Sequence, residues 1–444
     1  NLFCRYCDSG GSRVLHGRDI GPHLDALVAF LSQDPDLHLK LYGGEPMLEP
    51  ELLRQLLRRV RQRHPKAAVL AGRFFQQESV PYKGLDAVID DLSRYLLRLP
   101  DKEVARLLPT DHTLIGHLFP VMKRHDPWDA SPALGLAPSN DTELRQRAFV
   151  ALRELLRRLA TTRPLLLAVD DLQWGDDDSG ALLAELLRPP AAPPLCFVGI
   201  HRAGEGAETK VLGRLRTALA EARGAAADVE VALTPLPTED SRRLAGVLLG
   251  DADADSTGVA ELVRQSEGSP FLVTELAWST HPGDDAGDSV SLESVVARRL
   301  SALPPAARAL LEVVAVAGYP LPAEIAFRAA GPADQGAVAL AALRAARMVR
   351  LRGAAPAEEI ECYHDRIREG VERALPRDAQ RAIHRRLAQQ LEGGPVRQPE
   401  HLARHFQAAG EPDRARRYLV QAAEGAVEAL AFDRAARLFH EASQ

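Results

Sequence analysis

Lysine is scarce in this chain, with six among 444 residues, and aromatic residues make up only 5%. Arginine therefore carries most of the positive charge, and abundant alanine and leucine favour helices with aliphatic cores. No apolar run approaches the roughly 20 residues that span a bilayer, and no signal peptide opens the chain, so we expect no membrane partner. The net charge of -6 does not indicate nucleic acid as a bulk partner.

Cysteine is rare as well. Cys4 and Cys7 lie close together, whereas Cys196 and Cys362 are solitary. This spacing does not make a disulfide framework, and with no secretory signal we expect a reducing, cytoplasmic location. Hydrophobic residues at 46% and charged residues at 26% are an ordinary globular balance, and the length suggests about three domains of ~150 residues.

Two α/β regions are expected in the first half. Residues 1–65 form a unit with a helix at 25–31, a strand at 38–41 that ends at Gly43 and Gly44, and a helix at 51–63. Residues 67–236 have expected strands at 68–70, 165–169, 195–200 and 229–233, and helices at 85–97, 144–159 and 182–187. Asp141 or Thr142 would cap the helix at 144–159. Apolar strands that alternate with helices predict a parallel sheet with helices on both faces.

The second half is mostly helical. Expected helices lie at 239–249, 257–265, 292–318, 324–330 and 337–348, with two wing strands at 349–352 and 359–363. The last three of these helices and the two strands suggest a winged-helix domain. Further helices at 381–391, 400–409, 413–424 and 432–442 pair as hairpins, and this array looks truncated because it stops at Gln444.

One strand carries acidic chemistry. The apolar run 165–169 is closed by Asp170 and Asp171. In phosphate-hydrolysing sites the first such acid holds magnesium and the second orients or deprotonates the attacking water. Both belong at a strand end, because ligands bind there in an open parallel sheet. The alternative is a plain strand followed by a polar turn.

The longer segment 165–176 resembles the Walker B segment of signal-transduction AAA-type (STAND) ATPases, in which Asp-Asp-Leu-His/Gln-Trp is characteristic. The resemblance covers about residues 67–444 and is close to modules fused to bacterial serine/threonine kinases or transcriptional regulators. It implies that Asp170 holds the metal, that Asp171 positions water and that Arg202 senses phosphate. It also implies that Pro270 fixes a turn beside the nucleotide base. Alternatively, Arg202 is a solvated strand-end arginine and Pro270 belongs to a helix-capping turn.

Four further segments resemble parts of the same family. The segments 363–369 and 401–406 occur in its winged-helix and tetratricopeptide-like parts, where His405 and Phe406 would be packing residues. The segments 72–75 and 80–83 resemble the stretch after its first helix. We interpret the first two segments as structural.

The phosphate-binding loop of such ATPases is absent from the sequence. That loop reads Gly-x4-Gly-Lys-Ser/Thr, with backbone amides around the phosphates and a lysine that neutralises them. None of the six lysines follows a glycine. At the corresponding place, residues 41–49 contain glutamates, which would repel phosphate. Binding of Mg-ATP and its turnover are therefore expected to be impaired.

The first residues suggest a second chemistry. Residues 1–8 resemble the radical S-adenosylmethionine motif Cys-x3-Cys-x2-Cys, of which Cys4 and Cys7 are present. The segment Gly43, Gly44, Glu45 and Pro46 resembles that family's second signature. Together these resemblances imply a [4Fe-4S] cluster and bound S-adenosylmethionine. The alternative is a degenerate start of the ATPase, which residues 17–19 also resemble.

The expected domains are a radical-enzyme-like fragment at 1–65, an ATPase core at 67–236, a helical lid at 237–280, a winged-helix-like domain at 290–376 and tetratricopeptide-like helices at 378–444. The fold class is thus α/β followed by all-α. Three functions are weighed: a regulatory ATPase module, a radical-enzyme fragment and a catalytically dead interaction scaffold. The C-terminal helices would bind protein partners, and nucleic acid is expected only through the winged helix.

Overall fold

The computed structural model describes residues 4–8, 11–15, 38–43, 57–58, 60–75, 82–124, 140–202, 209–221, 228–233, 235–249, 257–279, 298–331, 335–352, 358–394 and 398–444. The chain divides into two compact units. Unit 1 contains residues 1–234 and 423–437, and unit 2 contains residues 235–422 and 438–444.

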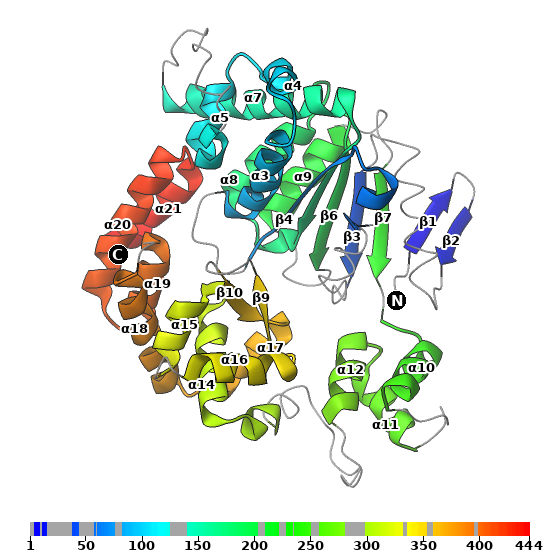
Figure 1. Ribbon diagram of the computed structural model, residues 1–444, viewed down its shortest axis with the longest axis vertical. Coiled ribbons are helices and arrows are strands. Elements are labelled where there is room, and N and C mark those ends of the chain that lie inside the picture. Colours follow the sequence, from blue (N-terminus) through cyan, green and yellow to red (C-terminus); the bar gives the residue numbers. More distant parts are fainter. Residues whose placement is uncertain are drawn as a thin grey trace. The chain divides into compact units, whose positions relative to one another are not determined.

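A five-stranded parallel sheet forms the centre of unit 1 (Figure 1). Every residue of its strand β5 is buried, as its uninterrupted apolar run predicts. The expected parallel sheet is therefore confirmed. The strands, in the order β4-β5-β6-β3-β7, are β4 (Ala68–Arg73), β5 (Leu165–Asp170), β6 (Cys196–Arg202), β3 (His38–Gly43) and β7 (Asp228–Leu233).

The place of β3 corrects the expected division of the chain after residue 65. This strand, expected in a separate N-terminal fragment, pairs with β6 on one side and β7 on the other. In the register, His38 lies beside Phe197 of β6 and Asp228 of β7. Residues 38–43 therefore complete the five-stranded sheet. A parallel ladder joins backbone groups far apart in sequence, and no local pattern shows that pairing.

The direction of the connections changes between β3 and β6. The chain leaves β3 for β4 at one edge of the sheet and leaves β6 for β7 at the other edge. Neighbouring strands with such opposite connections form a topological switch point, and ligands of open α/β sheets bind outside the strand ends there.

The helices of unit 1 confirm three expected helices and correct one expected cap. Helices at 85–97, 144–159 and 182–187 were expected, and α3, α7 and α8 fill these places. The cap of α7 is Asn140, whose side chain accepts a hydrogen bond from the Glu143 amide at 2.9 Å, rather than Asp141 or Thr142. The bounds are α3 (Lys83–Leu96), α4 (Asp101–Leu107), α5 (His112–Leu118), η1 (Pro120–Arg124), α7 (Asp141–Thr162), η2 (Leu172–Trp174), α8 (Asp177–Leu187) and α9 (Lys210–Glu221).

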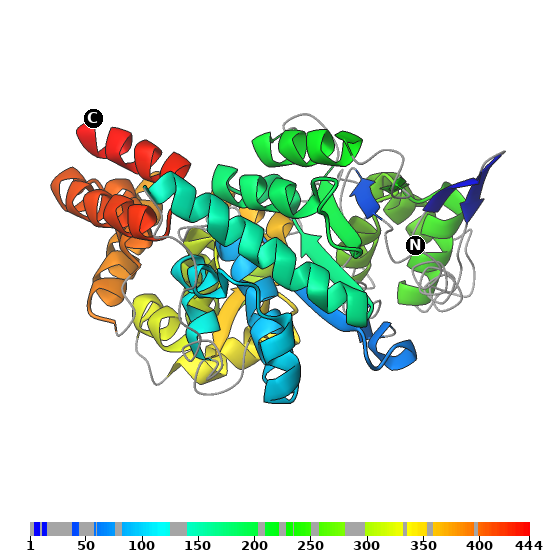
Figure 2. The same ribbon diagram turned by 90° about the horizontal axis from the view of Figure 1, so that it is seen from above.

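The long helix α7, teal in Figure 2, packs one apolar face into unit 1. Its buried residues recur at helical spacing and include Ala148, Leu152, Leu155 and Leu159. At the start of the chain, β1 (Cys4–Asp8) and β2 (Gly11–Leu15) form an antiparallel hairpin. The helix expected at 25–31 lies outside the described residues.

Unit 2 begins with three helices, α10 (Thr238–Leu249), α11 (Thr257–Ser266) and α12 (Pro270–Ser279). They share a small apolar core that includes Ala245 and Val273.

The next part of unit 2 combines four helices with a short antiparallel sheet, β8-β10-β9. The helix expected at 292–318 is interrupted, because residues 298–302 are helical and α14 begins only at Pro305, after Pro304. Both prolines lack an amide hydrogen, so the helix starts there rather than running through. The elements are α14 (Pro305–Ala317), β8 (Leu321–Pro322), α15 (Ala323–Ala330), α16 (Gly336–Ala345), β9 (Val349–Arg352), β10 (Glu359–Cys362) and α17 (Asp365–Ala374).

Four helices end the chain, as the sequence predicts. They are α18 (Arg377–Glu392), α19 (Pro399–Ala408), α20 (Pro412–Glu428) and α21 (Phe432–Ser443). Among the described residues, no helix is both long and apolar enough to cross a membrane.

Candidate functional site

The two acids predicted from the sequence lie where β5 ends. Asp170 is the last residue of this strand, and its side chain is 12% exposed. Asp171 adopts the left-handed conformation, with φ of 54°, and its amide donates to Asp170 Oδ1 at 2.9 Å. Asp tolerates this conformation better than most residues, because its short polar side chain can bond locally. The chain thus turns sharply at the carboxyl edge of the sheet and leaves both acids there.

Arg73 is a site residue that the sequence did not single out. It ends β4 and is the register partner of Asp170. Its Nε donates to Asp171 Oδ2 at 2.7 Å and lies 4.0 Å from Asp170 Oδ2. The only sequence signal was its place in the stretch 72–75. Its role depends on the pairing of β4 with β5.

Gln173 completes the surroundings of Asp171. From the turn η2, its Nε2 donates to Asp171 Oδ1 at 2.8 Å, so both carboxylate oxygens of Asp171 accept a hydrogen bond. Gln173 was seen in the sequence as part of the family segment, but its contact was not predicted. Two carboxylates facing one guanidinium carry a net negative charge, and Mg²⁺ takes one or two carboxylates while keeping several waters. This donor set is compatible with Mg²⁺, and metal binding by Asp170 stays a prediction from sequence.

Two other predicted residues meet at the switch point. Gly43 ends β3, Arg202 ends β6, and they are register partners. The buried His201 precedes Arg202. Gly44, Glu45 and Pro46 lie outside the described residues, as does the Arg202 side chain.

Pro270 lies in unit 2, at the start of α12. The turn before it has positive φ at Glu267 and at Gly268. The carbonyl of Gly268 accepts the Leu236 amide at 2.7 Å, and a Cβ at Gly268 would lie 2.6 Å from the Leu236 oxygen. The turn therefore joins the start of unit 2 to its three-helix core. A role for Pro270 beside a nucleotide base stays a prediction.

Cys4 and Cys7 lie in β1, opposite Leu15 and Ser12. Within the described ranges, no group of three or more His, Cys, Asp or Glu residues is arranged to hold a metal ion. An iron–sulfur cluster and bound S-adenosylmethionine stay predictions from sequence.

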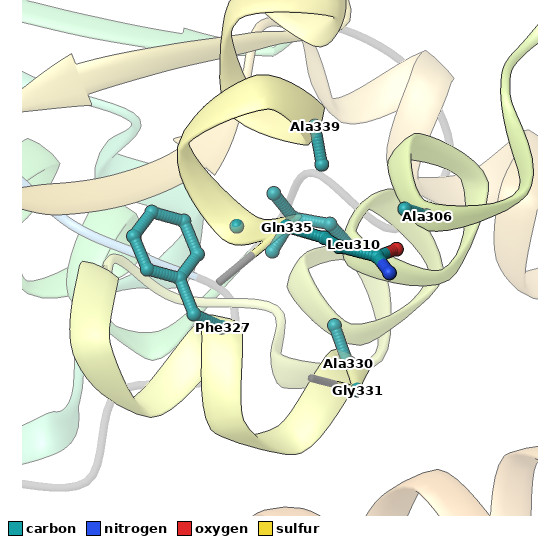
Figure 3. Close-up of a pocket in the computed structure, with 8 residues that line it drawn as sticks. Ala306, Leu310, Phe327, Ala330, Gly331, Gln335 and Ala339 are labelled. Atoms are coloured by element: carbon teal, nitrogen blue, oxygen red, sulfur yellow. The ribbon is translucent and has the colours of Figure 1, made fainter. Parts of the chain in front are cut away.

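A small hollow of about 50 Å³ lies in unit 2 between α14, α15 and α16 (Figure 3). Leu310, Phe327 and Ala339 line it, and Gln335 is the only polar side chain among its described lining residues. It has no titratable or nucleophilic group, so it offers no chemistry for catalysis.

Comparison with known proteins relates the region that contains the two acids to a known family. Residues 51–198 match the family model of the AAA ATPase domain. This region includes β4, β5, Asp170 and Asp171, whereas β3 and residues 41–49 precede it. No curated protein matches the chain.

Among solved structures, the chain is similar to a Signal Transduction ATPase with Numerous Domains from Pyrococcus horikoshii that has a tetratricopeptide repeat sensor. The identity is 13%, the TM-score is 0.52, and the match covers 97% of this chain and 58% of that one. The Walker-type ATPase of Pyrococcus abyssi is 16% identical over 80% of this chain and 95% of its own, with a TM-score of 0.34. The first likeness indicates a shared fold, and the second is too distant to carry an argument. The stretch from residue 51 to residue 198, with its two strand-end acids, is thus similar to AAA ATPase domains.

Proposed function

We propose that this chain is a regulatory ATPase module of the signal-transduction AAA type, which binds a magnesium nucleotide and turns it over poorly. The observation that carries the proposal is the placement of Asp170 and Asp171 at the carboxyl edge of a parallel sheet with a switch point. The match of residues 51–198 to the AAA ATPase domain supports it.

The residues around the predicted magnesium ion suit this function. Asp170 would hold Mg²⁺, and the ion would supply positive charge to the phosphates. Arg73 and Gln173 fix the carboxylate of Asp171 next to it. Arg202, beside Gly43, would sense phosphate.

The phosphate side explains slow turnover. The sequence after Gly43 has no lysine where a phosphate-binding loop would need one. Asp171 is also poorly placed to act as a base, because each of its oxygens already accepts a hydrogen bond. Arg73 would have to release it first. Both features favour a switch that responds to nucleotide over an efficient hydrolase.

The remaining parts would transmit the nucleotide state. We assign a lid to residues 237–280, with Pro270 near the base, and a winged-helix-like role to residues 290–376. The helices from residue 378 onward would bind protein partners in the cytoplasm. The repeat sensor named for the Pyrococcus horikoshii protein supports this assignment. Nucleic acid would bind only through the winged-helix-like part.

Nucleotide-binding calorimetry on the full chain tests the proposal. We expect ATP to bind in the presence of Mg²⁺ and Asp170→Ala to weaken binding at least ~10-fold, since a metal ligand is lost. Asp177→Ala is the matched control, because Asp177 pairs with the exposed Lys210 at 2.9 Å. Absence of binding to the wild-type chain would instead favour the interaction scaffold, which the missing lysine and the engaged Asp171 also fit.

The radical-enzyme alternative is tested separately. Iron and sulfide would be measured after anaerobic reconstitution of the wild-type chain and of a Cys4→Ala, Cys7→Ala variant. Cluster binding that depends on both cysteines would support it, and equal metal content in the two proteins would exclude it.

A further inference from the structure

The helix α21 begins without a capping side chain of its own. Ala431 precedes its first residue, Phe432, and the side chain of alanine has no oxygen to accept a first-turn amide. Instead, Asp178 of α8 accepts the Arg434 amide on Oδ2 at 3.1 Å, although it lies 256 residues earlier in the chain. A carboxylate at a helix N-terminus also interacts favourably with the helix dipole. Asp178 therefore caps α21 from a distant part of the sequence.

A second set of contacts holds this cap in place. Arg145 of α7 donates to Asp178 Oδ1 at 3.0 Å, and its guanidinium lies over the ring of Phe432 at 5.1 Å. Arg434 Nη1 lies 3.8 Å from Asp176 Oδ2. The start of α21 thus meets an anchored carboxylate and a cation stacked on its first side chain.

The turn before α21 is held as well. Tyr82, which is fully buried at the start of α3, donates its hydroxyl to the Leu430 carbonyl at 3.2 Å. Leu430 itself is in the left-handed region, with φ of 57°. A leucine is strained there, so the contact must hold a conformation that the turn would not favour by itself.

The segment is also buried, since Leu430, Ala431 and Ala435 are 3%, 0% and 4% exposed. Two features nevertheless oppose its packing. The carboxyl of Asp178 is fully buried, and it faces the like charges of Asp176 and Asp433 as well as Arg145. Burial of a charged group between like charges opposes the packing of residues 430–434 against unit 1, and so does the strain at Leu430. A segment whose packing is opposed by backbone strain and by like charges opens at a lower free energy than a core without these costs.

We propose that Tyr82, Arg145 and Asp178 form a seat for residues 430–434, and that this seat is a reversible latch which opens while the sheet stays folded. The occupant is this chain's own α20–α21 turn, since residues 423–437 already belong to unit 1. The seat lies at the start of α3, on α7 and on α8. Since α3 and α8 follow β4 and β5, Tyr82 and Asp178 are close in sequence to Arg73 and Asp171. The latch goes beyond the proposed function and is measured without nucleotide.

Hydrogen exchange of the full chain, read by mass spectrometry, tests the latch. In the wild type we expect amides of residues 430–437 to exchange at least ~10-fold faster than those of β5, because the latch opens before the sheet. Asp178→Ala and Tyr82→Phe should each speed exchange at 430–437 a further severalfold and leave β5 unchanged. Asp177→Ala, in the same turn of α8, should change neither.

Two results would overturn the proposal. One is equal protection of residues 430–437 and β5 in the wild type, which would make the segment part of the core. The other is unchanged exchange at 430–437 in Tyr82→Phe, a variant that keeps the buried ring and loses only the hydroxyl. Neither result bears on nucleotide binding, so the proposed function stands or falls on its own experiment.

Discussion

Arg73 at the end of β4 donates its Nε hydrogen to Asp171 Oδ2 at 2.7 Å, although the two residues lie 98 positions apart in the sequence. The Asp171 side chain is 6% exposed and that of Arg73 is 21% exposed, so solvent screens this ion pair only weakly. The pair fixes the second acid of the candidate site and joins β4 to β5 at their functional edge.

Removing one partner of this pair should destabilise unit 1. Arg73→Ala leaves Asp171 buried without its cation, and we expect the free energy of unfolding to fall by about 3 kcal/mol. Chemical denaturation measures it. Arg94→Ala is the control, because Arg94 pairs with Asp91 at the surface, and such pairs contribute about 0–1 kcal/mol. Equal losses in the two variants would show that the Arg73 pair is no stronger than a surface pair.

A buried histidine pair predicts acid destabilisation of unit 2. His384 Nδ1 and His405 Nδ1 lie 2.8 Å apart, and the Tyr319 hydroxyl is 3.1 Å from His405 Nε2. Burial, followed by the nearby charge of Arg404, lowers the pKa of His384 to about 4 and holds the pKa of His405 well below 6.5. Unfolded histidines take up protons below about pH 6.5. The unfolded state therefore binds more protons down to about pH 4, and stability falls as pH drops through this window.

The loss of folding free energy should steepen below about pH 6.5 and approach about 1.4 kcal/mol per pH unit for His384, with a further loss in the same direction from His405. Denaturation of the wild-type chain at pH 7, 6 and 5 measures it, with a probe in unit 2. His384→Gln should remove part of the slope. A stability of unit 2 that does not change between pH 7 and 5 would contradict this account.

Asp178 predicts the opposite pH dependence for the latch. Burial, outweighing its bonds to the Arg434 amide and to Arg145, raises the pKa of Asp178 to about 6. The facing charges of Asp176 and Asp433 raise it in the same direction, and Tyr82 lies in the same cluster. Between about pH 3.8 and 6 the closed latch holds a proton that a solvated Asp178 has lost. Closure is therefore favoured by acid and weakened as pH rises to about 6.

From pH 7 to pH 5 the open population of residues 430–437 should fall about 10-fold. Hydrogen exchange corrected for the intrinsic effect of pH measures this change. In Asp178→Asn, which has no titrating carboxyl, the open population should not depend on pH. A dependence that persists in Asp178→Asn would assign the effect to another group.

Gly268 should tolerate no side chain. Its φ is +77°, and a Cβ there would lie 2.6 Å from the Leu236 carbonyl oxygen. We expect Gly268→Ala to lower the stability of the α10–α12 core by about 1–3 kcal/mol, through strain and backbone displacement. Gly258→Ala in α11 is the matched control, because nothing lies within 4 Å of its added Cβ. This control should be neutral or stabilising by up to about 1 kcal/mol. Thermal unfolding of both variants compares them.

Much of the fold could be predicted from local pattern. The apolar run of β5, the periodicity of α7 and the four C-terminal helices were all expected, because burial and helical spacing are written in neighbouring residues. The predictions of helix ends were wrong where neighbouring residues offered competing cap or start signals. Asn140 was passed over as the α7 cap in favour of the next two residues, and the prolines at 304 and 305 were underestimated as a helix start.

The candidate site was predicted only in part. Asp170 and Asp171 were found because two acids after a buried strand are a local signal with a known chemistry. Arg73, the Gln173 contact and the Asp178 cap of α21 were missed, because each depends on contacts between distant segments. The nearness of Gly43 to Arg202 was missed for the same reason.

By itself, the sequence determined which segments become strands and helices and where two carboxylates follow a buried strand, since these follow from side-chain pattern and turn chemistry. Only the tertiary structure decided that β3 lies between β6 and β7, that Arg73 meets Asp171, and that α21 takes its cap from α8. The physical reason is that strand order and ion pairing are set by which distant groups bury one another, and local pattern does not encode that choice.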